Sequence, residues 1–192
     1  MRKIDEQKQA AIVKAVYQIT YDEGITNLSI AKIARSVGVS KATMYVYYDD
    51  KADMLSKIFL NVKHLIDDGL AELLAVNLPF KQRVQGALTN FADKFVEYPY
   101  ETNFMNAIMD NPSLVNDGVI DQAMQMSKPL NDLFTEGVIN KHWLTDDMEI
   151  LIALLFAPLQ EFTVTYFKRN MSVPQAKLTE LIDILIRINV VE

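Results

Sequence analysis

Apolar residues in the first part of the chain recur at helical spacing. Four of them fall at i, i+3, i+4 and i+7: Ile12, Ala15, Val16 and Ile19. This spacing predicts a helix over about 5–23 with one apolar stripe. Gly24 follows at the position where a helix C-cap is expected.

Residues that begin and end helices divide the next stretch into short elements. Ser29 is a good N-cap for a second helix, and Gly38 ends it. Ser40 is then a good N-cap for a third short helix. Asp49 or Asp50 begins a long fourth helix, whose apolar residues again follow helical spacing.

The rest of the chain also has helical periodicity. Helices are expected over about 80–97, 101–110 and 145–170, with a last one opened by Pro174. The region 113–140 is expected to be broken by Pro129 and Gly137. The chain has no Asn-Gly or Asp-Gly hairpin turn and no alternating β-branched run. We therefore predict an all-α protein of about nine helices.

Composition excludes several kinds of chemistry. The chain has 192 residues, half of them hydrophobic, and no cysteine. Disulfides, thiolate catalysis and cysteine-based zinc sites are excluded. Residues 1–63 carry ten lysines and arginines against seven acidic residues, a net charge of +3, whereas residues 64–192 carry −9. This asymmetry suggests that only the front of the chain meets an anionic partner.

The hydropathy pattern favours a cytoplasmic protein. The first residues are charged and lack the apolar run of a signal peptide. The longest apolar run, Ile150 to Leu159, has ten residues, which is too short to span a bilayer. We therefore expect no membrane partner.

The segment from Ser29 to Lys51 has the layout of a helix-turn-helix. Gly38 stands where the tight turn needs a positive φ angle. Four apolar residues are spaced to hold the two helices together: Ile33, Ala34, Val39 and Met44. The polar side chains of the third helix remain free to face outward.

At these residues the sequence resembles the TetR family of bacterial regulators. The matching elements, in the family's order and spacing, are Ile12-x-x-Ala15-Val16, Gly24, Ile33-Ala34, Gly38-Val39-Ser40, Thr43-Met44-Tyr45, Tyr47-Tyr48 and Lys51. They cover about the first 55 residues. The resemblance implies a three-helix DNA-binding domain over 1–50 and a helical ligand-binding and dimerisation domain over 51–192.

The resemblance also implies which residues contact DNA, with the third helix in the major groove. Lys41, Ala42 and Thr43 would reach base edges, and Tyr45 bases or backbone. Ser29, Tyr47 and Lys51 would contact phosphates, and Ser40 is a further DNA-binding candidate. Tyr48 is interpreted as a packing residue.

The last two helices are apolar on more than one face, which favours a homodimer. The alternative is a helix buried deep in a large core. The candidate interface residues are Leu155, Leu159, Leu178, Leu181, Ile182 and Leu185.

A ligand pocket is expected inside the C-terminal domain, which is rich in methionine and aromatic residues. The candidate residues are Phe104, Met105, Met109, Phe134, Phe162 and Tyr166. The alternative interpretation of the same residues is ordinary core. Pro158 is expected to kink its helix and open space beside Phe162.

Motifs of catalysis are missing from the sequence. It has no Gly-rich phosphate loop and no G-x-S-x-G elbow, and His64 and His142 are isolated. We predict neither an enzyme nor a metal or cofactor site. The expected function is a DNA-binding transcriptional repressor that a small-molecule effector releases from its double-stranded operator. The alternatives are an activator, or a protein-interaction protein that needs no inducer.

Overall fold

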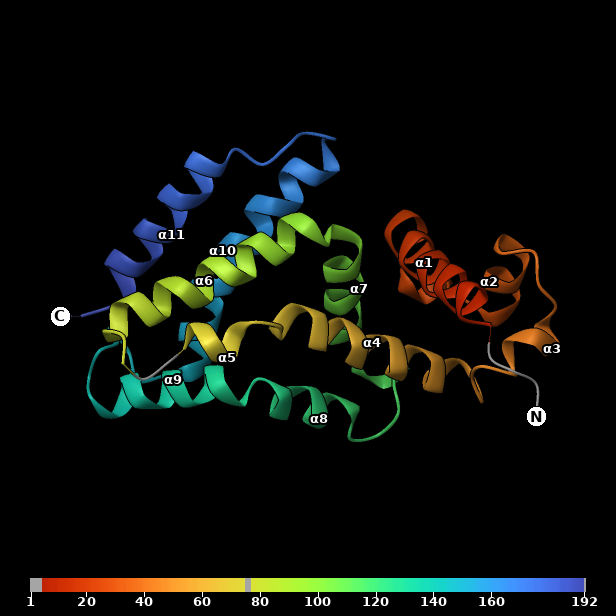
Figure 1. Ribbon diagram of the computed structural model, residues 1–192, viewed down its shortest axis with the longest axis horizontal. Coiled ribbons are helices and arrows are strands. Elements are labelled where there is room, and N and C mark those ends of the chain that lie inside the picture. Colours follow the sequence, from red (N-terminus) through yellow and green to blue (C-terminus); the bar gives the residue numbers. More distant parts are fainter. Residues whose placement is uncertain (1–4, 75–76, 192) are drawn as a thin grey trace. The chain divides into compact units, whose positions relative to one another are not determined.

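The computed structural model describes residues 5–74 and 77–191, which fold almost entirely into helices. Figure 1 shows the α-helices in chain order: α1 (Glu6–Glu23), α2 (Ile30–Ser36), α3 (Lys41–Met44), α4 (Lys51–Asp67), α5 (Leu70–Leu73), α6 (Phe80–Glu97), α7 (Pro99–Met109), α8 (Val119–Met126), α9 (Lys128–Ile139), α10 (Met148–Lys168) and α11 (Gln175–Asn189). Two 3₁₀ helices are η1 (Ile25–Asn27) and η2 (Pro112–Leu114). The described residues contain no β-strand, only an isolated bridge between Trp143 and Val190. The all-α prediction is confirmed. The described residues form more than the expected nine helices because α5 was not predicted and the region 113–140 contains two α-helices, α8 and α9.

The chain divides into two compact units. Unit 1 comprises Met1–Leu65 and Tyr100–Met126, and unit 2 comprises Ile66–Pro99 and Ser127–Glu192. The boundary expected after residue 50 falls within unit 1. The reason is that later residues pack with the first helices, as when the ring of Phe104 on α7 lies 5.5 Å from that of Tyr17 on α1.

The predicted caps form in unit 1. Asp5 caps α1 by accepting a hydrogen bond from the backbone N–H of Lys8 at 3.2 Å. Gly24 ends α1 with φ +82°, and its N–H donates to the carbonyl of Thr20. The apolar stripe of α1 is buried, with Ile12 and Val16 fully inaccessible to solvent.

The core of unit 2 forms where α6 packs against α10 and α11, which also pack against each other (Figure 1). Buried apolar residues from all three helices meet there, among them Leu88, Leu155 and Ile182. On α6, the buried Arg83 donates two hydrogen bonds to the carboxylate of Glu136 on α9. This pairing satisfies a charge that would otherwise be costly to bury.

The region 113–140 is broken near Pro129, as expected, but it is not broken at Gly137. Pro129 lies in the first turn of α9, where its missing N–H costs no helical hydrogen bond. Gly137 lies inside α9 and is buried. A Cβ atom at this position would overlap the indole of Trp143 and the ring of Phe80. The glycine is therefore needed for close packing and does not end the helix.

Helix α10 lies within the helix expected over 145–170 and extends beyond the ten-residue apolar run at Ile150 to Leu159. It has 21 residues and is long and apolar enough to cross a membrane by length and composition alone. Only 22% of its most apolar stretch is buried within the described chain. Three of its large apolar residues are exposed: Ile150, Ile152 and Leu154.

Candidate DNA-binding site

Two serine caps define the helices of the candidate site. The side chain of Ser29 accepts a hydrogen bond from the N–H of Lys32 at 3.2 Å and so begins α2. The side chain of Ser40 accepts one from the N–H of Thr43 at 3.1 Å and begins α3. Both serines thus satisfy backbone donors of their own helices, which would otherwise lack partners.

The turn between α2 and α3 has the geometry that the sequence predicts. Gly38 adopts φ +70°, a conformation that favours glycine. The N–H of Val39 then donates to the carbonyl of Ala34 at 2.9 Å. Ile33, Ala34 and Met44 are buried between the helices, and Val39 is half-buried. The turn therefore holds α3 in a fixed position against α2.

One face of α3 and the turn after it is left open to solvent. Lys41 and Ala42 are exposed, the side chain of Tyr45 is 55% exposed and that of Val46 is 41% exposed. Thr43 is half-buried, and its hydroxyl shares a 2.9 Å hydrogen bond with that of Ser40. Val46 was not among the predicted contacts. Its exposure beside Tyr45 makes it a further candidate, because apolar side chains can contact the thymine methyl group.

The two tyrosines after α3 have different environments. Tyr48 is 3% exposed and packs in the core of unit 1, as predicted. Tyr47 is half-buried, and its hydroxyl donates to the carbonyl of Asp5 at 3.4 Å. Tyr47 therefore connects the segment after α3 to the start of α1.

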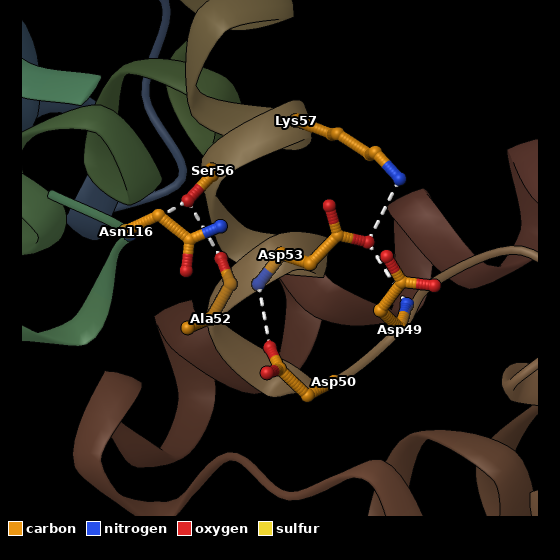
Figure 2. Close-up of polar contacts among 7 residues, drawn as sticks. All are labelled: Asp49, Asp50, Ala52, Asp53, Ser56, Lys57 and Asn116. Atoms are coloured by element: carbon orange, nitrogen blue, oxygen red, sulfur yellow. Dashed lines mark hydrogen bonds and ion pairs between the residues drawn. The ribbon is translucent and has the colours of Figure 1, made fainter. Parts of the chain in front are cut away.

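An acidic network fixes the start of α4. The carboxylate of Asp50 accepts a hydrogen bond from the N–H of Asp53 at 2.8 Å, as expected for a cap (Figure 2). Asp53 in turn accepts from the N–H of Asp49 and from the ammonium group of Lys57 at 2.8 Å. The two bonds to the backbone N–H groups of Asp49 and Asp53 set the direction of the backbone at Lys51, the first residue of α4.

The basic residues of this part of the chain fall into two groups. Three are neutralised by carboxylates within the chain: Lys8 by Asp5, Lys32 by Glu23, and Lys57 by Asp53. Among the described residues, no carboxylate lies within ion-pair distance of three others: Arg35, Lys41 and Lys51. Burial lowers the pKa of Lys51, and no acidic neighbour offsets this. These three charges are available for an external anion.

The predicted pocket residues are divided between the two units. Phe162 and Tyr166 line a cavity of about 500 Å³ in unit 2, together with Pro158. Phe104 and Phe134 are buried in the cores of units 1 and 2, respectively. Two methionines of α7 complete the set, of which Met105 is half-buried and Met109 is 40% exposed.

Five of the six residues predicted for a dimer interface are buried within unit 2 itself: Leu155, Leu159, Leu178, Ile182 and Leu185. They pack into the core shared by α6, α10 and α11 and have no surface left for a partner. Only Leu181 is partly exposed. The assignment is corrected because the stripe that is most apolar in sequence faces the chain's own core.

Comparison with known proteins agrees with this geometry. Residues 12–58 match the family described as bacterial regulatory proteins, tetR family. An uncharacterized HTH-type transcriptional regulator, YdeS, of Bacillus subtilis is 35% identical over 60 residues, which are 31% of this chain and 30% of that protein. The chain thus matches about 30% of the length of its curated relatives.

Solved structures match over the whole chain. A TetR family transcription regulator from Marinobacter aquaeolei has a TM-score of 0.85 at 17% identity, with 100% of both chains covered. A protein described as a TetR family transcription regulator from Shewanella has a TM-score of 0.77 at 20% identity, covering 96% of this chain and 99% of its own. These likenesses establish the fold.

Proposed function

We propose that this chain, which belongs to the TetR family of bacterial regulatory proteins, is a transcription regulator that binds double-stranded operator DNA through α2 and α3. The observation that carries the proposal is the open face of α3, flanked by unpaired basic residues. Lys41 and Tyr45 on this face contact base edges in the major groove. Arg35 and Lys51 contact phosphates and set the register.

Lys51 has a second reason to bind phosphate. It is the first residue of α4, where backbone N–H groups point toward an incoming anion. Its partial burial disfavours the ammonium charge in the absence of a partner. A phosphate beside Lys51 stabilises the ammonium charge. The phosphate then contacts both the Lys51 side chain and the N-terminus of α4.

The protein acts as a homodimer in this proposal. The short α3 reads few bases, so two copies reading half-sites about 34–36 Å apart supply the specificity. Exposed apolar residues of α10 and α11 support an interface there, among them Ile152 and Ile188. Burial against a second copy also accounts for the apolar character of α10 in a cytoplasmic protein.

A small-molecule effector releases the operator and makes the protein a repressor. Unit 2 offers the cavity lined by Pro158, Phe162 and Tyr166, whose volume lies within the range of small-molecule sites. An effector that binds one conformation more tightly by a few kcal/mol shifts the population away from the DNA-binding form. The family consists of DNA-binding regulators, in agreement with the prediction that the chain is not an enzyme.

The test is fluorescence anisotropy of the full chain on labelled DNA flanking its own gene, at two salt concentrations. We expect tight, salt-sensitive binding to one palindromic segment, lost in the double variant Tyr45→Ala, Lys51→Ala. Lys57→Ala is the matched control, because Lys57 is already paired with Asp53. Equal weak binding to flanking and random DNA, unchanged by the double variant, would contradict the proposal.

A further inference from the structure

A second cavity lies within unit 1, away from the face that α3 presents. Its volume is about 550 Å³, which is within the range of small-molecule sites. Three helices contribute to it, with Tyr17 from α1, Asn61 from α4 and Tyr100 from α7. The cavity therefore contacts the first helix of the DNA-binding region as well as two helices of the remaining chain.

Two tyrosines form aromatic walls that are held in place by neighbouring rings. The ring of Tyr17 lies 5.5 Å from that of the fully buried Phe104. The ring of Tyr100 meets that of Tyr21 edge-on, at 5.2 Å and 75°. Packing of this kind fixes the tyrosine side chains before a ligand arrives, which lowers the entropy cost of binding.

The residues that line the cavity carry a net negative charge. It holds the carboxylates of Glu6 and Glu101 and one ammonium group, that of Lys14. None of these three side chains forms an ion pair with another described residue. Burial raises the pKa of Tyr17, and the charge of Glu101, which lines the same cavity, raises it further, so this phenol is neutral.

We propose that this cavity binds a hydrophobic organic cation, whose charge faces Glu101 and whose apolar body packs against Tyr17 and Tyr100. Aromatic faces attract cations, also at sites that remain open to solvent. Two carboxylates against one lysine leave a net charge of −1, which selects a cation over an anion of the same shape. Ala10 and Val13 supply apolar contact for the rest of the ligand.

The site has a regulatory consequence that rests on the proposed DNA-binding function. A ligand held between α1 and the pair α4 and α7 contacts the helix-turn-helix region directly. It changes operator affinity if the cavity differs in shape between the free and DNA-bound forms. The binding of the cation itself does not depend on that function.

The test uses two probes of the same shape and opposite charge, tetraphenylphosphonium and tetraphenylborate, titrated into the full chain by calorimetry. We expect the phosphonium to bind at one site per chain and the borate to bind at least about tenfold more weakly. Glu101→Gln is expected to weaken phosphonium binding about tenfold. Glu97→Gln removes the same charge from α6, outside the cavity, and is expected to change nothing.

A second variant, Tyr100→Leu, removes one aromatic wall and should also weaken phosphonium binding. Circular dichroism checks that each variant remains helical. The proposal is overturned if both probes bind alike, if neither binds, or if Glu101→Gln and Glu97→Gln behave identically. Repeating the DNA titration in the presence of phosphonium distinguishes the cation site from the proposed DNA-binding function. If the chain binds the cation but no DNA, the cation site is supported and the proposed function is contradicted.

Discussion

The hydroxyl oxygen of Ser56 on α4 accepts a 2.9 Å hydrogen bond from the backbone N–H of Asn116, which lies 60 residues later in the chain. The same hydroxyl donates to the carbonyl of Ala52 at 2.7 Å, so it acts both as a donor and as an acceptor (Figure 2). Ser56 is 5% exposed. This bond fixes the segment between η2 and α8 to the helix that follows the DNA-binding region.

Replacing Ser56 by alanine is expected to free this segment. The N–H of Asn116 would lose its acceptor, at a cost of about 1 kcal/mol in the free energy of unfolding. Hydrogen exchange followed by mass spectrometry should show faster exchange around Asn116. Thr135→Ala is the control, since the Thr135 hydroxyl is exposed and bonds only within its own helix. Equal exchange around Asn116 in both variants would show that the Ser56 bond does not hold the segment.

Gly137 packs against Trp143 so closely that a methyl group does not fit between them. The indole of Trp143 also donates a 3.1 Å hydrogen bond to the carbonyl of Phe134, which keeps the ring in position. The ring of Phe80 closes the other side, 5.0 Å from that of Trp143. Moving the tryptophan away would therefore break this hydrogen bond and the ring contact.

Gly137→Ala is expected to lower the free energy of unfolding by about 1–3 kcal/mol through overpacking. This occurs although alanine favours a helix over glycine by about 1 kcal/mol. Urea unfolding followed by fluorescence of Trp143, the single tryptophan of the chain, gives the value. Gly86→Ala on α6 is the matched control, because its added Cβ would meet only ordinary contacts at 3.7 Å. It should be neutral or stabilising, and a similar loss in both variants would refute the packing argument.

Local signals in the sequence predicted the helices and the turn between Ser29 and Met44 well. Ser29 and Ser40 act as caps through their own side chains, and Gly38 takes a conformation that other residues avoid. Each of these effects is decided within about four residues of the chain. The order of helices and the open face of α3 followed from them.

Features that depend on distant residues were not predictable. The carboxylate of Glu101 lies near Tyr17 only because α7 packs against α1, 84 positions away in sequence. Periodicity marked Leu155 and Leu185 as apolar but could not say whether α6 or a second copy covers them. Gly137 looked like a helix break, because its need to accommodate Trp143 appears only in the folded chain.

The pair of Arg83 and Glu136 makes stability depend on pH. Hydrogen bonding to Arg83 holds the pKa of Glu136 below its ordinary value of 4.5. A carboxylate with a lowered pKa in the folded state stabilises the protein fully above the unfolded pKa and loses this effect as the pH falls through the folded pKa.

Glu136→Gln is therefore expected to reduce the free energy of unfolding by about 1 kcal/mol at pH 7, a modest value because Glu136 is partly exposed. The difference from the natural chain should stay constant down to about pH 5 and shrink below it. Urea unfolding at a series of pH values measures it. Asp132→Asn, which alters an exposed pair with Lys128, should have little effect at any pH. A difference for Glu136→Gln that grows on acidification would have the wrong sign.

Lys51→Gln is expected to weaken DNA binding about equally on all sequences, because phosphate contacts carry no sequence information. The slope of log affinity against log salt should fall by about 0.9 for each lost phosphate contact, one in each half of a dimer. Lys57→Gln should leave the slope unchanged, since its ammonium group is held by Asp53. Anisotropy titrations over a range of salt concentrations measure the slope, and equal slopes in all three proteins would place Lys51 away from the phosphates.

Ile188 on α11 offers the test of the dimer, because it is 51% exposed although apolar. In a twofold dimer, Ile188→Glu places one negative charge from each copy in the interface. The two buried charges should shift the protein from dimer to monomer, which sedimentation equilibrium measures. Ile139→Glu is the control, since Ile139 on α9 is 73% exposed and lies outside the two helices of the proposed interface. If Ile188→Glu stays dimeric while Ile139→Glu becomes monomeric, the interface lies on α9 instead. Because the operator needs two α3 helices, a monomeric Ile188→Glu should also lose palindrome binding while each chain keeps its fold.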